Sequence, residues 1–321
     1  MTVSEKLKSS AASALRPALK TGLWIIAITV PVSFGVLLLK ITGLLPVIAR
    51  LFAPLFALFG MPGESALVFV TAGLVNIYAC IAVIDTLDLT SRTVTILALM
   101  CLISHNLAVE CAVQKKTGTS FFVILAVRLA ASFAGAFALN LMLPADSLPL
   151  MYATDARTIA ASGFGAELTA WFAGICYLCA KIIILVTLLM ILQRLLETFG
   201  IMRLLSNLLK YPLMVLGIPH EAAFLWIVAN TLGLAYGAGV IIDHVERGGL
   251  CAQHADLLNY HIAISHSLLE DTLLFVAIGV TAGWIIFPRI ILAAMVVWIK
   301  RFLDLIFGKT GRRRLQNQNI H

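Results

Sequence analysis

The chain contains one stretch, residues 60–110, whose landmarks return later in the same order. Residues 60–64 read Gly-Met-Pro-Gly-Glu, and residues 217–221, 157 positions later, read Gly-Ile-Pro-His-Glu. An apolar run ending in Ile-Asp follows each motif, and an Ile-Ser-His element follows each run at an offset of 161. The same offset of 161 separates Glu110 from Asp271 and Arg128 from Arg289. Landmarks on two constant offsets predict an internal duplication.

The composition places this duplicated unit in a membrane. Of the 321 residues, 61% are hydrophobic and only 12% are charged, and the mean hydropathy is +1.00. A soluble domain carries about a quarter charged residues, so this chain lacks the polar residues that a water-facing surface needs. The sequence predicts an all-α polytopic membrane protein with about 8–10 transmembrane or re-entrant helices in two internal repeats.

The apolar runs predict how the two repeats are laid out. We expect spans at about 21–42, 65–85, 94–112 and 119–143, and again at 169–192, 222–242, 257–275 and 278–308. The shorter runs 44–59 and 199–216 favour interfacial, re-entrant or steeply tilted segments. The predicted units are a basic lead (1–20), repeat 1 (21–143), a linker (144–168), repeat 2 (169–308) and a basic tail (309–321).

The distribution of charge predicts the topology. The net charge is +7, and the basic residues gather at both ends of the chain. Lys and Arg stay on the cytoplasmic side of a membrane, so we expect both termini inside, in a multi-pass protein of the cell inner (cytoplasmic) membrane. The same argument makes a nucleic-acid partner the poorer interpretation. With the linker outside, each repeat crosses an odd number of times and the repeats are inverted; a parallel arrangement is the alternative.

Two glutamates at matched positions are the first candidate site residues. Pro62 and Pro219 prevent the preceding residue from continuing a helix, so Glu64 and Glu221 fall in the first turn of the next helix, where the helix dipole favours an anion. One interpretation is a charged helix start. The other is that the two carboxylates converge on a cavity lined by broken helices when the halves pack face to face.

The Ser-His elements are the second candidate. Ser104 and His105, and their counterparts Ser265 and His266, lie in apolar surroundings, where ionisable side chains are costly and face the bundle interior. Carboxylates follow each element within two turns, Glu110 in the first repeat and Asp271 in the second. A single buried histidine is more often structural, but two at matched positions favour a binding site.

Three further polar residues lie inside predicted spans. Lys181 is near the middle of 169–192 and needs a partner or a water-filled cavity, so we expect it to balance one of the buried carboxylates. Asn76 and Asn230 provide amide donors and acceptors, either for a polar solute or as contacts between helices.

The sequence argues against an enzyme. Neighbouring residues on a helix point apart, so Ser104 beside His105 is not a catalytic dyad. The motifs G-x-S-x-G, H-E-x-x-H and G-x-x-x-x-G-K-[ST] are absent, and we expect no cofactor. A metal site stays open, because imidazole and carboxylate suit Fe, Mn or Zn. Repeat 2 holds five of the seven histidines: His220, His244, His254, His261 and His266.

The opening motif at 60–64, the apolar helix after it and the duplicated Ile-Ser-His element resemble the nucleoside recognition (Gate) domain family of bacterial membrane proteins. That family is similar to the spore maturation A and B proteins and to the permease part of bacterial ferrous-iron transporters. The resemblance covers nearly the whole chain as two Gate-like units, and the second unit departs at His220, where the first has Gly63. It implies a multi-pass inner-membrane protein that moves or gates a small solute.

Together these patterns predict a secondary transporter or permease for a small polar solute, nucleoside-like by the family's label, with its site between the repeats. A permease for a divalent metal and a non-transporting assembly or gating subunit remain alternatives. The expected partners are a small molecule or ion and the lipid bilayer. A homo-oligomer is compatible with the sequence. The candidate substrate-binding residues are Glu64, Asn76, Ser104, His105, Glu110, Lys181, Glu221, Asn230, Ser265, His266 and Asp271.

Overall fold

The computed structural model describes residues 3–144, 163–231 and 233–318, and every element in them is a helix. The predicted all-α fold class is confirmed. The first half contains α1 (Val3–Ile41), α2 (Leu44–Ala57), α3 (Ser65–Leu74), α4 (Ile77–Thr86), α5 (Ser91–Ser104), α6 (Leu107–Lys116) and α7 (Phe121–Met142). The second contains α8 (Gly163–Thr198), α9 (Ile201–Val215), the 3-10 turn η1 (His220–Ala222), α10 (Ala223–Thr231), α11 (Gly233–Glu246), α12 (Ala252–Ser265), α13 (Glu270–Val276) and α14 (Ala282–Gln318).

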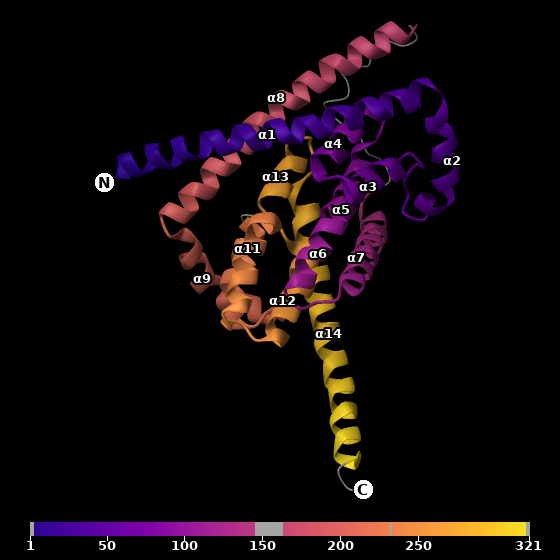
Figure 1. Ribbon diagram of the computed structural model, residues 1–321. Coiled ribbons are helices and arrows are strands. Elements are labelled where there is room, and N and C mark those ends of the chain that lie inside the picture. The colour runs from indigo at the N-terminus through magenta and orange to yellow at the C-terminus, as the bar shows by residue number, and fades with distance from the viewer. Residues whose placement is uncertain (1–2, 145–162, 232, 319–321) are drawn as a thin grey trace.

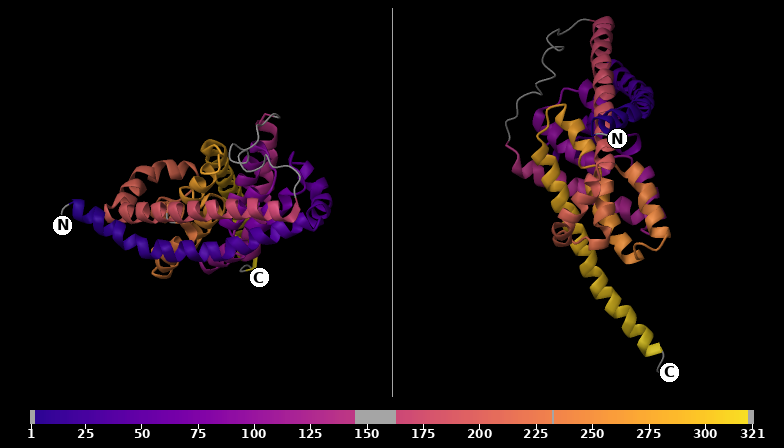
Figure 2. Two further views of the ribbon diagram at one scale, coloured as in Figure 1. Left: turned by 90° about the horizontal axis from the view of Figure 1, so that it is seen from above. Right: turned by 90° about the vertical axis from the view of Figure 1, so that its left-hand side faces the viewer.

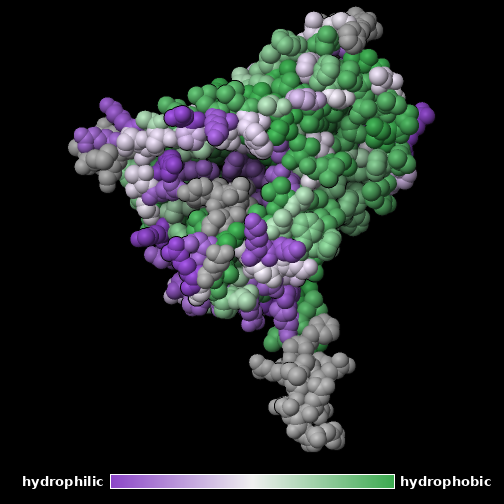
Figure 3. Space-filling model, viewed as in Figure 1, coloured by the Kyte–Doolittle hydropathy of each residue, from purple (hydrophilic) through white to green (hydrophobic). Residues whose placement is uncertain are grey.

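Five helical stretches of the described residues are long and apolar enough to cross a membrane. They are Leu7–Ile41, Ser91–Lys116, Phe121–Met142, Gly165–Thr198 and Ala282–Ile306. On the face shown in Figure 3, hydrophobic residues cover most of the side where α2 and α7 lie, and hydrophilic residues surround a hollow below α1. An apolar outer surface of this kind suits contact with lipid rather than water.

The first helices of the two halves, α1 and α8, run side by side across one end of the molecule (Figures 1 and 2). The indole Nε1 of Trp171 donates to the hydroxyl of Ser33 over 3.0 Å, and the Trp171 ring lies 5.2 Å from that of Phe34. Lys40 and Glu167 form an ion pair of 3.0 Å near the same end. The two halves are therefore joined at their outermost helices.

The predicted terminal units do not form separate elements. The basic lead 1–20 was expected to precede the first span, but α1 continues through Pro17 and Pro31 as one helix. Proline is tolerated in membrane helices because the freed backbone groups find other partners. Most of the predicted linker lies outside the described residues, and its last part belongs to α8. Residues 309–318 of the predicted tail continue α14.

Four predicted spans were expected to be continuous helices and are each divided in two. In the span 65–85, Asn76 takes an extended conformation, and its side chain accepts a hydrogen bond of 2.8 Å from the Ala79 amide, so it caps α4. In 94–112 and 257–275, the break is a residue in the left-handed region, Asn106 (φ 47°) and Ser267 (φ 54°). In 222–242, Gly233 starts α11 with φ 78°. Apolar periodicity does not reveal such breaks, because the hydrophobic residues continue through them.

Within each half, the two helix breaks lie next to each other and are joined by backbone hydrogen bonds. The Asn106 amide donates to the carbonyl of Ala72 near the end of α3, over 3.0 Å. In the second half the Ser267 amide donates to Ala229 and the Leu269 amide to Asn230, at 3.0 and 3.1 Å. Backbone groups released by one break are thus satisfied by the other, as irregular backbone inside a membrane protein requires.

The two halves share one core. Helices α5 and α7 of the first half contact α12 and α14 of the second, and α13 contacts α5 (Figure 1). Buried side chains from both halves form a single apolar cluster there, among them Met100, Leu102, Ile264 and Phe275. This packing brings the broken helices of both halves to the centre of the molecule.

We expect Gly63→Ala to lower the melting temperature. A Cβ at Gly63 would lie 1.8 Å from the main-chain oxygen of Ala49 in α2, so α2 and α3 would have to separate. Overpacking of this kind costs about 1–3 kcal/mol. Gly35→Ala is the matched control, since its Cβ would meet nothing within 4 Å. Thermal unfolding of both variants in detergent checks this, and equal melting temperatures would contradict it. The contact is specific to the first half, where Gly63 stands in place of the second half's His220.

Candidate functional site

Four of the predicted site residues meet between the two halves. His105 is the C-cap residue that follows α5, and Glu110 lies in the first turn of α6. His266 is the C-cap residue that follows α12, and Asp271 lies in the first turn of α13. Their side chains are between 1% and 9% exposed. Each half therefore contributes one histidine and one carboxylate, both placed by a helix break. We call these four residues the central cluster.

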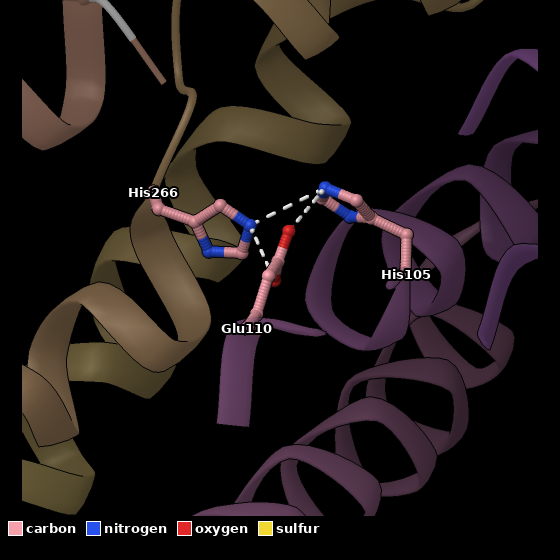
Figure 4. A group of neighbouring side chains, drawn as sticks. All are labelled: His105, Glu110 and His266. Atoms are coloured by element: carbon pink, nitrogen blue, oxygen red, sulfur yellow. Dashed lines mark hydrogen bonds and ion pairs between the residues drawn. The ribbon is translucent and has the colours of Figure 1, made fainter. Parts of the chain in front are cut away.

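The polar atoms of the central cluster lie within contact distance. The two Nε2 atoms of His105 and His266 are 3.3 Å apart. One oxygen of Glu110 lies 3.2 Å from His105 Nε2 and the other lies 3.0 Å from His266 Nε2. Asp271 Oδ2 lies 3.3 Å from His105 Nε2. Figure 4 shows His105, His266 and Glu110 pointing toward one another from their separate helices.

Two fully buried arginines hold the backbone around the central cluster. Arg128 of α7 donates through Nε to the Ile103 carbonyl (2.7 Å) and through Nη2 to the His105 carbonyl (2.8 Å). Arg289 of α14 makes the same pair of bonds, to Ile264 at 3.1 Å and to His266. Each arginine thus satisfies carbonyls at the C-terminal end of a broken helix, which have no partner within the helix. Arg128 Nη2 also pairs with Glu110 at 2.6 Å.

The arginines are site residues that sequence reasoning missed. An arginine near the start of a predicted span commonly extends its side chain toward the membrane surface, but neither of these side chains is exposed. The shared offset of 161 between Arg128 and Arg289, equal to that of the two histidines, was the signal that could have identified them.

A second polar contact extends the central cluster toward α4 and α8. The Tyr78 hydroxyl of α4 donates to Glu270, the neighbour of Asp271, over 3.1 Å. Tyr78 and Lys181 also line a cavity of about 160 Å³ whose other walls are apolar. The Lys181 ammonium donates to the carbonyl of Ala277, over 2.9 Å, at the end of α13. Lys181 therefore holds the C-terminal end of the helix that carries Asp271, and its pairing with a buried carboxylate stays a prediction.

Comparison with known proteins supports a membrane protein. Over 270 residues the chain is 34% identical to YvoD of Bacillus subtilis (strain 168), described as an uncharacterised membrane protein; the match covers 83% of this chain and 85% of that protein. The chain belongs to the YvoD family of membrane proteins. No protein-family model and no solved structure matches it. With several helices long enough to span a bilayer, this member of the YvoD family is a multi-pass α-helical membrane protein.

The two glutamates of the Gly-x-Pro motifs do not belong to the central cluster. Glu221 is 43% exposed and faces His220 and His254, at 3.3 and 3.4 Å. Glu64 is half-buried just before α3. Among the described residues neither carboxylate contacts the central cluster, so the expectation that they converge between the halves is wrong. The halves meet through the helices that follow these motifs, which leaves the motifs at the periphery.

The two serines are buried but point away from the central cluster. The Ser104 hydroxyl lies 3.4 Å from the main-chain oxygen of Arg128, and the Ser265 hydroxyl lies 2.8 Å from Nδ1 of His261. The same His261 nitrogen accepts a bond of 3.0 Å from the Trp226 indole. A serine next to a histidine on a helix faces another direction. The Ser104 hydroxyl therefore connects α5 to α7 and the Ser265 hydroxyl bonds within α12, and neither completes the site.

The two asparagines also have structural partners. The side-chain oxygen of Asn76 accepts the hydrogen bond that caps α4, as described above. Asn230 donates through Nδ2 to the Trp226 carbonyl over 2.9 Å. Its buried Oδ1 has no hydrogen-bond partner among the described residues. A role in binding solute is thus unsupported for Asn76 and stays a prediction for Asn230.

We expect Arg128→Met to destabilise the protein severely. It would leave two buried carbonyls and the Glu110 carboxylate without their donor, and breaking a buried ion pair costs about 3–5 kcal/mol. The matched control is Arg247→Met, which removes a 2.8 Å pair with Asp243 on an exposed helix surface and costs about 0.5 kcal/mol or less. Melting curves in detergent distinguish the two. A melting temperature for Arg128→Met within a degree or so of wild type would show that the arginine does not hold the break.

Proposed function

We propose that this protein is a permease that moves a small charged solute across the cytoplasmic membrane, with its solute site at the central cluster. The observation that carries the proposal is the meeting of His105, Glu110, His266 and Asp271 from both halves at breaks in membrane helices. Ionisable side chains at membrane depth are costly and mark solute or ion pathways. Broken helices lining a central site are a recurring feature of secondary transporters.

The similar order of helices in the two halves supports the proposal of an internal duplication. Each half has the same order of long, short and broken helices, and each arginine binds the histidine carbonyl of its own half. The left-handed residues Asn106 and Ser267 also keep the offset of 161. We propose that the halves are inverted repeats that rock against each other around the central cluster.

Of the solute classes that the sequence leaves open, the geometry favours a small ion. The polar atoms of the central cluster are 3.0–3.3 Å apart, which is too close to admit a nucleoside between them. The nearby 160 Å³ cavity is walled mainly by Ile and Leu side chains and lacks the convergent polar groups that a sugar or base would need. A nucleoside, which the Gate-family resemblance implies, is therefore the second candidate.

Figure 3 shows a hollow that opens to water on one face of the molecule. Hydrophilic residues edge it below α1, on the side away from the apolar surface of α2 and α7. A charged solute needs such a water-exposed approach, because crossing the hydrocarbon region without one is costly.

Transport is tested by reconstituting the purified protein in liposomes and measuring uptake of radiolabelled manganese, zinc, uridine and adenosine. We expect uptake of an ion, reduced about tenfold or more in Glu110→Gln/Asp271→Asn, because both carboxylates would lose their charge. Glu221→Gln is the control and should transport like wild type.

Two results would contradict the proposal. Wild-type liposomes that take up none of these solutes faster than empty ones would favour a non-transporting membrane subunit. The same subunit interpretation would follow if the double variant folded and transported like wild type. Uptake of nucleosides but not ions would keep the permease and replace its solute.

A further inference from the structure

We infer that His105, His266 and Glu110 bind one divalent transition-metal ion. The inference rests on the proposed function, because it names the solute of that site. Each of the three side chains offers one ligand atom, and these three atoms lie within 4.8 Å of one another. All three residues are buried. Asp271, next to His105, supplies a further carboxylate at the edge of the group.

The tautomer of each histidine follows from the main-chain carbonyl that its Nδ1 atom faces. Nδ1 of His105 lies 3.2 Å from the carbonyl oxygen of Cys101, and Nδ1 of His266 lies 2.8 Å from that of Ile262. A carbonyl oxygen can only accept, so each Nδ1 carries the hydrogen. A neutral imidazole protonated at Nδ1 has a bare lone pair at Nε2. This is how metal-binding histidines are usually oriented, with the other ring nitrogen donating to a carbonyl or carboxylate.

The two bare nitrogens face each other and two carboxylates. Nε2 of His105 and Nε2 of His266 are 3.3 Å apart, with oxygens of Glu110 at 3.0–3.2 Å. Asp271 Oδ2 is buried and has no hydrogen-bond partner among the described residues. Lone pairs at these distances repel unless a positive charge lies between them.

The spacing fits a metal ion. Zinc binds histidine nitrogen at about 2.0–2.1 Å and carboxylate oxygen at about 2.0–2.2 Å, with tetrahedral geometry. Two ligand atoms of such a tetrahedron are about 3.3–3.4 Å apart. The two histidine Nε2 atoms are 3.3 Å apart, which matches this spacing, and each Nε2 has a different oxygen of Glu110 within a few tenths of an ångström of it, at 3.2 Å for His105 and 3.0 Å for His266. Three protein ligands leave a fourth position for water or for Asp271.

The ligand atoms select the class of metal. Two imidazoles and a carboxylate suit Zn, Fe, Mn or Co in the divalent state, whereas Mg and Ca prefer sites built from oxygen alone. Three protein ligands with an open fourth position differ from a closed structural zinc site, which has four protein ligands.

The charges around the site favour a cation over an anion. Three carboxyl groups, Glu110, Glu270 and Asp271, lie in or beside the central cluster, against two guanidinium groups, Arg128 and Arg289, so potential anions outnumber the fixed cations. Nε and Nη2 of both arginines donate to backbone carbonyls, and Arg128 Nη2 also pairs with Glu110. A single proton shared by the two Nε2 atoms would also supply positive charge, and it is the rival that the experiment must separate from a metal ion.

The test uses full-length protein in detergent, stripped with a chelator and titrated with Co²⁺ under visible absorption spectroscopy. We expect one Co²⁺ per chain, with the strong visible bands of four- or five-coordinate cobalt, displaced by Zn²⁺. His105→Asn and His266→Asn should each weaken binding by about 100-fold or more, because loss of a ligand costs at least as much as the roughly 10–100-fold of an outer-shell partner. Thermal unfolding of the stripped proteins checks that both variants fold.

Two further variants separate ligation from indirect effects. His266→Cys replaces an imidazole by a thiolate, so a new sulfur-to-cobalt charge-transfer band in the near ultraviolet should appear if residue 266 is a ligand. His220→Ala/His254→Ala removes the exposed histidines beside Glu221 and serves as the control for adventitious surface binding. Binding by this control should equal that of wild type.

The inference is overturned if wild-type protein binds no Co²⁺ or Zn²⁺ at millimolar concentration. It is also overturned if binding survives in the His105 and His266 variants and disappears in the surface control. In either case ion or nucleoside uptake by liposomes would still be measured independently. If the protein transports a solute but binds no metal ion, a proton shared by the two histidines is favoured. If it binds a metal ion but transports nothing, it is a metal-binding membrane protein and not a permease.

Discussion

The buried arginines that bind main-chain carbonyls are the interaction on which the centre of this protein depends. Each broken membrane helix leaves carbonyls without partners, and water is not available to satisfy them. Arg128 and Arg289 provide several donors in a fixed fork, and they reach the breaks from α7 and α14. The breaks can then direct His105 and His266 into the interface between the halves.

The crossing of broken helices explains why the site is compact. A break lets the chain turn so that a residue ending one helix and a residue starting the next face the same point. His105 with Glu110, and His266 with Asp271, are placed in this way. Because α5 and α7 pack on α12 and α14, the two pairs meet with their polar atoms 3.0–3.3 Å apart.

Sequence patterns were most informative where two positions shared an offset. The pairs His105 with His266 and Glu110 with Asp271 were predicted as site residues, and the structure brings them together. The pair Glu64 with Glu221 also shared an offset, yet the structure leaves it at the periphery. A shared offset predicts that two positions correspond in the two halves, but it does not predict on which side of the packed helices they lie.

The sequence by itself determined the membrane class, the all-helical fold and the matched polar residues, because hydrophobicity and spacing are local properties of the chain. Only the tertiary structure decided which residues meet. The helix breaks at Asn76, Asn106 and Ser267 depend on backbone conformation, and the burial of Arg128 depends on carbonyls from another helix. The contacts that Arg128 and Asn106 make join segments that are distant in the sequence, and hydrophobic periodicity does not predict such contacts.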